Sequence, residues 1–300
     1  MVQCLYTYEG AIKMKKYFEL IRIKHYLKNG LVFLPLIFSG KMFESNLFFS
    51  SLFAFLSFCA ISSVVYIIND LKDVNSDRLH VVKKNRPLAA GKISVRSAKI
   101  MGIVFLIMAV GFHLITTKGE IDYSGLFILG YLILNIGYSY GLKNVPLLDI
   151  VILVAGFLIR VLYGGVIIDV AISNWLYLTV ISTAFYLVLS KRRNEINNDM
   201  KSKKVLKYYN KDYLDKNMYV CLAVAIVFYA LWTVDPIIVS KTNNLLIWTV
   251  PLIIIIFMKY NLNVGSDGYS DPVEIVFSDK VLMFLIIIYI GIVSVILYIM

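Results

Sequence analysis

Long apolar blocks constrain this chain more than any other feature. They recur along its 300 residues and run to roughly 17–23 positions each, the length of a helix that crosses a hydrocarbon core of about 30 Å. Lipid offers no partner to free backbone groups, so such blocks must be helices or strands of a closed barrel. Barrel strands alternate in polarity, and these blocks do not. We therefore expect nine transmembrane helices, near 31–40, 46–68, 98–116, 124–140, 145–168, 174–190, 218–239, 245–258 and 280–299.

The composition excludes an ordinary soluble domain. Hydrophobic residues make up 59% of the chain and charged residues 16%, whereas soluble domains have roughly 45–50% and 25%. Cys4, Cys59 and Cys221 lie far apart, so neither a disulfide framework nor a zinc site is indicated. The basic, interrupted first 30 residues do not resemble a cleavable signal peptide. We expect one α-helical membrane domain over 1–300.

The distribution of Lys and Arg predicts the orientation. Of the 30 such residues, 26 fall in alternate segments: the N-terminal part, 69–99, 141–144, 191–217 and 259–280. Only Lys41, Lys118 and Lys241 fall in the opposite set. This excess predicts a cytoplasmic N-terminus, cytoplasmic loops at 69–97 and 191–217, and a C-terminus outside. The net charge of +11 is thereby explained without a nucleic-acid partner. The Lys-, Asn- and Ile-rich usage suggests an AT-rich bacterial genome, and we expect a multi-pass protein of the bacterial inner membrane.

An acidic motif follows the second block, Asn69-Asp70-x-x-Asp73-x-x-x-Asp77. On a continuing helix, positions 70, 73 and 77 fall at about 0°, −60° and −20°, so three carboxylates share one face. Like charges at this spacing repel, and a divalent cation removes the conflict. Mg²⁺ usually takes one or two carboxylates together with phosphate oxygens. The motif predicts a Mg²⁺–diphosphate site with these four residues as metal ligands; the alternative is a solvated acidic patch.

Cations follow the acidic motif directly. They are Arg78, His80, Lys83, Lys84 and Arg86. Carboxylates for a metal followed by cations for phosphate are typical of a site for a metal-chelated polyphosphate. Gly91 is expected to end the loop, with Ser94 as the N-cap of the next helix.

These motifs resemble the first aspartate motif of the UbiA superfamily of intramembrane transferases. The wider chain is similar to its branch of polyprenyl-phosphate phosphoribosyltransferases, whose named type uses decaprenyl phosphate. The similar segments are Arg22-x-x-His25-x-x-Lys28-Asn29, Asp77-Arg78-x-His80-x-x-Lys83-x-x-Arg86-Pro87-x-Ala89-Ala90-Gly91, Tyr138-Ser139 to Asp149, Gly156-Phe157-x-x-Arg160-x-x-x-Gly164-Gly165, Lys191-Arg192-Arg193-x-Glu195, Val205-Leu206-x-x-Tyr209, Ala230-Leu231-Trp232 and Asp271-Pro272-x-Glu274. The resemblance covers nearly the whole chain, and Val81 departs from it where the branch usually has proline.

The resemblance implies nine helices, a cytoplasmic N-terminus and an active site that faces the cytoplasm. It implies catalytic roles for Asn69, Asp73 and Asp77. The expected substrate-binding residues are Lys28, Arg78, Lys83, Arg86, Tyr138, Arg160, Lys191, Arg192, Arg193 and Glu195.

The second long loop bears on the substrate. Family members that transfer a prenyl group to an aromatic ring carry a second aspartate-rich motif there, whereas this chain has Lys191-Arg192-Arg193. Three cations can clamp a phosphate directly, although they also suit simple anchoring at the cytoplasmic face. Phosphoribosyl pyrophosphate and a polyprenyl phosphate together have a matching charge pattern. A lipid phosphate, with a second pKa of about 6, attacks without a general base.

We therefore expect Mg²⁺-dependent transfer of 5-phosphoribosyl from phosphoribosyl pyrophosphate to a polyprenyl phosphate, for lipid-linked arabinofuranose supply. One alternative keeps the fold but moves a prenyl group from prenyl diphosphate to a small aromatic acceptor. Another is a transporter whose carboxylates bind a coupling cation, although transporters tend to place such charges near the membrane midplane. No motif indicates an oligomeric state.

Two charges lie within the predicted fifth span, Asp149 and Arg160. Eleven residues separate them, about 20° past three full turns, so both face the same way. A charge at mid-membrane costs on the order of 2.5–3.5 kcal/mol and usually faces a cavity or a partner. We expect an interfacial Asp149, and an Arg160 that either guides lipid phosphate or forms a buried ion pair. Asp271 and Glu274 either assist the metal or ribose or are solvated.

Overall fold

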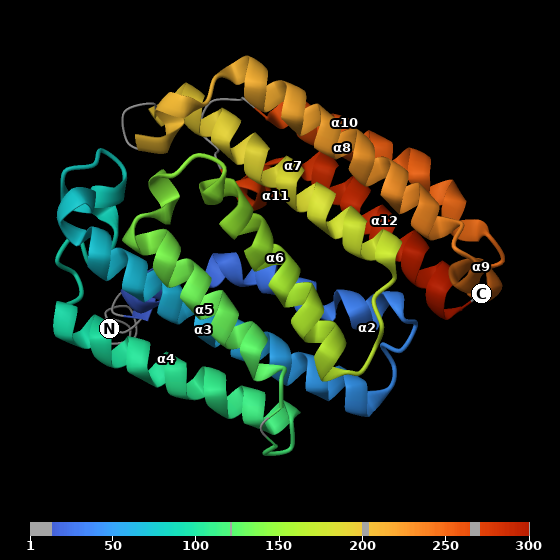
Figure 1. The fold of residues 1–300 in the computed structure, drawn as a ribbon, viewed down its shortest axis with the longest axis horizontal. Coiled ribbons are helices and arrows are strands. Elements are labelled where there is room, and N and C mark those ends of the chain that lie inside the picture. Colours follow the sequence, from blue (N-terminus) through green and yellow to red (C-terminus); the bar gives the residue numbers. More distant parts are fainter. Residues whose placement is uncertain (1–13, 121, 200–203, 265–270, 300) are drawn as a thin grey trace, which may run out of the picture. The chain divides into compact units, whose positions relative to one another are not determined.

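The computed structural model describes residues 14–120, 122–199, 204–264 and 271–299, and every regular element within these ranges is helical (Figure 1). Residues 14–21 are helical and precede the named elements. The elements are η1 (Ile23–Phe33), α2 (Leu34–Phe38), α3 (Ser45–Arg78), η2 (Lys83–Asn85), α4 (Val95–Thr116), α5 (Gly125–Tyr140), η3 (Leu142–Asn144), α6 (Leu148–Ile167), α7 (Asn174–Asp199), η4 (Lys204–Tyr208), α8 (Lys211–Thr233), α9 (Pro236–Thr242), η5 (Leu245–Thr249), α10 (Val250–Asn263), α11 (Pro272–Ser278) and α12 (Lys280–Tyr298).

Six helical segments are long and apolar enough to cross a membrane, which confirms the α-helical membrane class. They are α3, α4, α6, α8, the segment Leu245–Asn263 and α12. The shorter α5 has 16 residues and is also apolar. The block predicted near 31–40 is divided: η1 ends at Phe33, and α2, with Pro35 in its first turn, covers only five residues. The count of nine spans stays a prediction.

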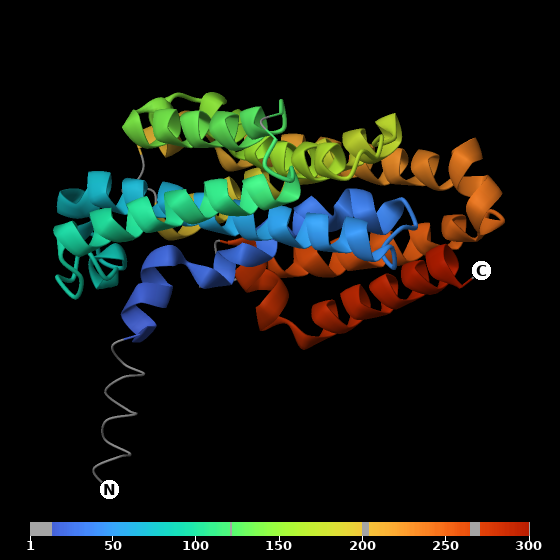
Figure 2. The ribbon, with the colours of Figure 1, turned by 90° about the horizontal axis from the view of Figure 1, so that it is seen from below.

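The helices form two compact units. Unit one comprises residues 1–34, 43–142 and 159–169, and unit two comprises 35–42, 143–158 and 170–300. In unit one, α4 runs alongside α3 over a core that includes Phe58, Ile61 and Tyr163 (Figures 1 and 2). In unit two, α7 packs along α8 around Tyr186 and Leu214 (Figure 1). The single domain expected from the sequence stays a prediction.

The length of α3 positions the acidic motif. Its 34 residues extend about 51 Å at 1.5 Å per residue, whereas about 20 residues suffice to cross a bilayer. The last turns therefore have no hydrocarbon to cross, and they carry Asn69 to Asp77. The first part of the predicted loop 69–97 is thus the continuing helix on which the three carboxylates were expected.

Two predicted signals mark the start of α4. Gly91 has a positive φ of 70°, a conformation that suits a residue without a Cβ. Ser94 is the N-cap of α4, and its Oγ accepts a hydrogen bond from the Ser97 backbone N–H at 3.1 Å. Both expectations at this loop end are confirmed.

A glycine in α6 permits close backbone packing in unit one. A Cβ built on Gly164 would lie 2.1 Å from the Val32 carbonyl oxygen of η1. Only a residue without a side chain fits this contact. Gly164 therefore holds η1, which follows Arg22, against the part of α6 that belongs to unit one.

Candidate metal–phosphate site

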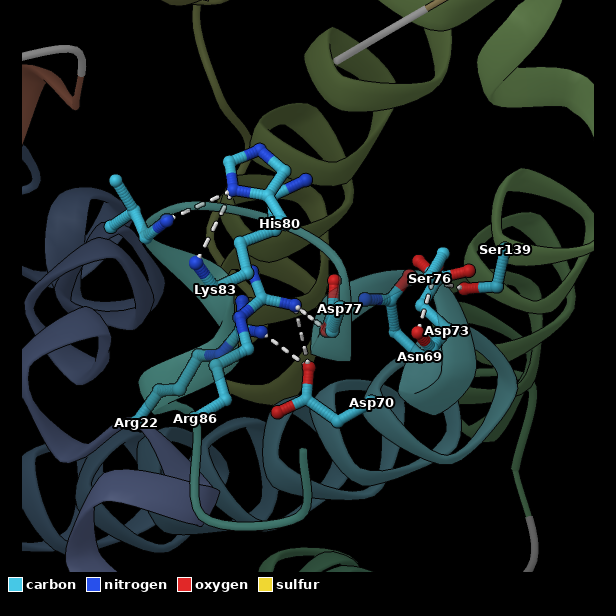
Figure 3. Close-up of polar contacts among 11 residues, drawn as sticks. Arg22, Asn69, Asp70, Asp73, Ser76, Asp77, His80, Lys83, Arg86 and Ser139 are labelled. Carbon is cyan, nitrogen blue, oxygen red and sulfur yellow. Dashed lines mark hydrogen bonds and ion pairs between the residues drawn. The ribbon is translucent and has the colours of Figure 1, made fainter. Parts of the chain in front are cut away.

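Arg86 bridges two carboxylates of the acidic motif. Its Nη1 donates to Asp77 Oδ2 at 2.8 Å and to Asp70 Oδ1 at 3.1 Å (Figure 3). The Asp70 and Asp77 side chains are only 3% and 5% exposed, whereas Arg86 is 26% exposed. A buried carboxylate requires a cation or several donors in place of water. Arg86, from the loop that follows α3, supplies this for both.

Arg22 reaches the same site from the segment just before η1. Its Nη2 donates to Asp70 Oδ1 at 2.6 Å, the oxygen that also accepts from Arg86. The Arg22 guanidinium lies over the ring of Tyr66, 4.6 Å from its centroid. Because Tyr66 also belongs to α3, this helix contacts Arg22 through both a carboxylate and an aromatic ring. Unit one therefore brings together two arginines and two aspartates from three segments of chain (Figure 3).

Asn69 and Asp73 lie on a neighbouring face of α3. At 100° per residue, positions 69, 73, 77 and 70 fall at about 0°, 40°, 80° and 100° round the helix. Ser139 of α5 donates its hydroxyl to Asn69 Oδ1 at 3.3 Å. Asn69 and Asp73 are half-buried, and Figure 3 shows them beside Ser139, apart from the arginine pair. Asn69 and Asp73 thus lie toward one edge of the acidic face, and Asp70 and Asp77 lie toward the other.

The donor set on α3 suits Mg²⁺ when substrate phosphates complete the coordination. Within the described ranges, no three His, Cys, Asp or Glu side chains gather closely enough to hold a metal by themselves. Mg²⁺ usually takes one or two carboxylates and leaves the remaining positions to phosphate and water. Asn69 and Asp73 offer one amide oxygen and one carboxylate on a common face. The four-residue ligand set stays a prediction.

His80 organises the loop between α3 and α4. Its Nδ1 accepts the backbone N–H groups of Val82 at 3.2 Å and Lys83 at 3.3 Å (Figure 3). This turn closes although Val81 occupies the position where the resembling branch has proline. Lys83 lies in η2, and Arg78, the last residue of α3, is exposed.

In unit two, Arg192 forms a fully buried ion-pair network. Its Nε donates to Asp149 Oδ2 at 2.7 Å, and its Nη1 donates to Glu195 Oε2 at 2.6 Å. Arg192 is 1% exposed and Asp149 0%, so protein encloses both groups, and the position of Asp149 at the membrane interface stays a prediction. The Tyr209 hydroxyl donates to Asp149 Oδ1 at 2.6 Å. Burial and then this hydrogen bond raise the pKa of Tyr209 well above its ordinary value, so the phenol keeps its proton.

The two neighbours of Arg192 are partly exposed. Lys191 Nζ lies 3.5 Å from Asp271 Oδ2, and Arg193 Nε donates to Asp215 Oδ1 at 2.7 Å. Their side chains are 29% and 22% exposed. Asp271 is buried against Lys191 and caps α11, so it is not a solvated loop carboxylate. All three cations of the basic run are thus ion-paired, but only Arg192 is enclosed.

Arg160 is buried in unit one, where it donates hydrogen bonds to neutral side chains. Its Nε donates to Asn29 Oδ1 at 2.8 Å, and its Nη2 donates to the Tyr131 hydroxyl at 3.0 Å. The guanidinium also lies over the rings of Tyr131 and Phe58. These contacts fix η1 to α3, α5 and α6. Substrate roles for Arg160, for the half-buried Lys28 of η1 and for Tyr138 of α5 stay predictions.

The sequence did not identify Ser139 or Tyr209 as site residues, and it grouped Arg22 with His25 and Lys28 without linking it to the acidic motif. Each stands inside a segment that carries the family resemblance, so the signal was present. The partners of Ser139, Tyr209 and Arg22 lie 70, 60 and 48 residues away in the chain, and only tertiary packing reveals such pairs.

Comparison with curated proteins identifies relatives along nearly the whole chain. The decaprenyl-phosphate phosphoribosyltransferase of Corynebacterium glutamicum is 30% identical over 93% of this chain and 86% of its own length. Its counterpart from Mycolicibacterium smegmatis is 28% identical over 93% of this chain and 91% of its own length. A more distant relative is the digeranylgeranylglyceryl phosphate synthase of Sulfurisphaera tokodaii, 24% identical over 61% of this chain and 62% of its own length.

Solved structures show the same fold. A UbiA homologue from Archaeoglobus fulgidus bound to GPP and Mg²⁺ aligns with a TM-score of 0.63 and 22% identity, covering 93% of this chain and 99% of that one. A structure described under digeranylgeranylglyceryl phosphate synthase aligns with a TM-score of 0.61 and 21% identity, covering 94% and 99%.

The family model described as the UbiA prenyltransferase family matches residues 32–288, which include α3 with its acidic motif and α7 with its basic run. The chain therefore belongs to the UbiA prenyltransferase family and is a membrane-embedded transferase.

Proposed function

We propose that this protein transfers a 5-phosphoribosyl group from phosphoribosyl pyrophosphate to a polyprenyl phosphate, with release of pyrophosphate. The main support is the basic run of α7. A second metal would need aspartates at this position, whereas Lys191 and Arg193 are partly exposed cations that suit phosphate. The names of the relatives that cover most of the chain support the same reaction class.

The acidic end of α3 is proposed to receive the diphosphate of the donor. Asn69, Asp73 and Asp77 would hold Mg²⁺, which when bound supplies positive charge that stabilises the leaving pyrophosphate. Arg86 contacts Asp77 of this set and carries N–H donors for phosphate oxygens. The metal-bound relatives support this assignment.

Formation of the new bond depends on how the lipid phosphate is oriented toward the ribose rather than on proton transfer. An oxygen of the lipid phosphate bonds to C1 of the ribose, and the bond from C1 to the pyrophosphate oxygen breaks. The attacking phosphate is already an anion near neutral pH, so no general base is required. Lys191 and Arg193 are proposed to hold phosphate oxygens. Arg192, enclosed by Asp149 and Glu195, is proposed to fix the helix end that presents them.

The proposed reaction predicts a lipid-linked product. Membranes that contain the protein should convert labelled phosphoribosyl pyrophosphate and polyprenyl phosphate to labelled lipid when Mg²⁺ is present. Membranes without the protein serve as the control. The absence of lipid-linked label, with Mg²⁺ and both substrates supplied, contradicts the proposal.

The second candidate is prenyl transfer to a small aromatic acceptor. The GPP-bound relative of the same fold favours it. It requires productive binding of a prenyl diphosphate, and Lys191→Ala would then leave turnover intact. Under the phosphoribosyl proposal, Lys191→Ala lowers turnover because a phosphate contact is lost.

A further inference from the structure

A short helix near the N-terminus, residues 14–21, packs beside the start of α4 in unit one (Figures 1 and 2). Its inner face places Leu20 in the same core cluster as Ala98 of α4. Lys16 Nζ also donates to the Lys92 backbone carbonyl at 3.0 Å, just before α4 begins. The outer sides of this helix and of the start of α4 therefore belong to one surface.

Cations gather on this surface, which we call the basic surface. Four of its five cations are exposed and one is half-buried; they are Lys15, Lys16, Lys92, Arg96 and Lys99. Among the residues that the structure describes, none of the five has an ion-pair partner. The same two segments contain one carboxylate, the exposed Glu19. Five cations against one carboxylate leave an excess of four positive charges.

The start of α8, in unit two, shows a helix end of similar composition that is neutralised. Lys216 Nζ lies 2.8 Å from Asp212 Oδ2, and residues 211–216 hold two cations and two carboxylates. Residues 92–99, at the start of α4, hold three cations and no carboxylate. Two of these three lie three residues apart on the helix, where like charges repel. A countercharge from outside the chain removes this repulsion.

Apolar side chains continue the basic surface on both helices. Phe18 is 45% exposed and lies about 160° from the buried Leu20 round its helix. Ile103 of α4 is 60% exposed and falls within about 60° of both Arg96 and Lys99. Only 17% of the apolar stretch of α4 is buried within the chain, as expected for a helix that faces lipid. The cations thus stand at the end of a lipid-facing side, where headgroups lie.

We propose that the basic surface binds the headgroups of anionic phospholipids in the leaflet that it faces. The headgroup phosphates supply the countercharge, and Phe18 and Ile103 contact the acyl chains beneath them. Each Lys or Arg near an anionic membrane surface strengthens binding by about fivefold, so the surface prefers anionic to zwitterionic lipid. These lipids belong to the bilayer and are not the substrate, so the inference does not depend on the proposed reaction.

The first test compares melting temperatures of the full chain in two kinds of lipid nanodisc. One contains phosphatidylcholine alone, and the other contains phosphatidylglycerol as well. The wild type should melt several degrees higher with phosphatidylglycerol, and high salt should remove most of this gain because it screens exposed charges. Equal melting in the two discs overturns the proposal.

Paired substitutions test whether the gain comes from the basic surface. Arg96→Gln with Lys99→Gln removes two of its cations and should remove at least half of the gain. Lys211→Gln with Lys216→Gln is the matched control, because it removes two exposed cations from the start of α8. It should leave the gain unchanged. If the two double variants lose the gain alike, lipid binding follows net charge alone and the proposal fails.

The second test locates the lipid directly. Phosphatidylglycerol with a photoreactive headgroup should label the peptides that contain residues 14–21 and 92–103. Lys15→Gln with Lys92→Gln should lower this labelling roughly tenfold or more, and this variant also serves if the α4 variant does not fold. Labelling that is unchanged in it, or that occurs mainly at 204–224 in the wild type, overturns the proposal. Inorganic phosphate in excess should not compete with the label; if it does, the surface binds a free anion and the lipid assignment is wrong.

Discussion

Arg192 and Arg193 are adjacent in the chain, yet their surroundings give them different roles. Arg192 is 1% exposed and contacts two carboxylates, whereas Arg193 is 22% exposed and contacts one. A guanidinium that is enclosed by carboxylates has its charge already balanced and cannot be reached by a lipid phosphate. Burial therefore distinguishes two residues that look alike in the sequence: Arg192 holds the helix end in place, whereas Arg193 is exposed enough to contact a ligand.

The buried pair predicts a stability effect. Arg192→Met should lower the free energy of unfolding by about 3–5 kcal/mol, because Asp149 and Glu195 lose their buried counter-ion. Asp149→Asn should cost less, since Arg192 keeps Glu195 and the amide oxygen can still accept from Tyr209. Denaturation in detergent checks both variants. An Arg192→Met protein that unfolds like wild type but binds pyrophosphate more weakly would make Arg192 a direct phosphate ligand.

At the scale of the element, α3 joins the apolar and polar parts of unit one. Its middle turns bury Ala54 and Phe58 in the core, and its last turns carry Asn69 to Asp77. Because α3 is one continuous helix, the carboxylates at its end have a fixed position relative to its apolar, membrane-spanning part. Helical spacing puts Asp70 and Asp73 only about 60° apart on the same face, so the elements packed against each position decide which partner it meets.

The close contact between α6 and η1 gives an element-scale prediction. Gly164→Ala would place a Cβ 2.1 Å from the Val32 carbonyl oxygen, so the backbone of η1 must move. Overpacking of this kind costs typically 1–3 kcal/mol and here acts on backbone. We expect a lower melting temperature and weaker pyrophosphate binding, since Arg22 directly precedes η1.

Gly111→Ala in α4 is the matched control. Its added Cβ meets nothing within 4 Å, and alanine suits a helix better than glycine by roughly 0.5–1 kcal/mol. Its melting temperature should equal or slightly exceed that of wild type. If both glycine variants melt alike, the contact at Gly164 does not constrain η1.

The long apolar helices, the acidic motif and the cap of α4 could be predicted from the sequence because each depends on local pattern, whereas the count of nine spans stays a prediction. Ser94 and Gly91 act within a few residues, and the acidic face of α3 follows from helical spacing. The partners of the carboxylates could not be predicted in this way. Arg22 meets Asp70 across 48 residues, and Arg192 meets Asp149 across 43. Such pairs arise from packing between elements, on which the spacing of one helix carries no information.

For the whole molecule, the positive charges predict a single orientation. A cysteine introduced at Lys84 should react with a membrane-impermeant maleimide only after the cytoplasmic face is opened. A cysteine at Lys118 should react in intact cells, because the other side of the membrane carries few Lys and Arg. Labelling of both sites from the same side contradicts the predicted orientation.

The background for that experiment must lack the native thiols, Cys4, Cys59 and Cys221. Cys59 is buried and Cys221 is partly buried. Cys59→Ser is therefore the substitution whose effect on folding must be checked. Melting of the cysteine-free protein within a few degrees of wild type qualifies it as the parent.

Metal removal provides a second test of the whole molecule. With Mg²⁺, phosphoribosyl pyrophosphate at a hundredfold excess over its Kd should stabilise the folded protein by about 2.7 kcal/mol. Chelation with EDTA should remove most of this gain, because the carboxylates of α3 then repel the diphosphate. Stabilisation by geranyl diphosphate but not by phosphoribosyl pyrophosphate would favour prenyl transfer instead.

The pair between Asp149 and Arg192 has a consequence for how the chain is made. Arg192 follows Asp149 by 43 residues, so at roughly 5–20 residues per second it leaves the ribosome about 2–9 s later. Tyr209, the other donor to Asp149, comes later still. During insertion α6 therefore carries an acidic residue whose partners have not been synthesised. We expect its first turn to stay near the aqueous face until α7 has been synthesised and Arg192 can pair with Asp149.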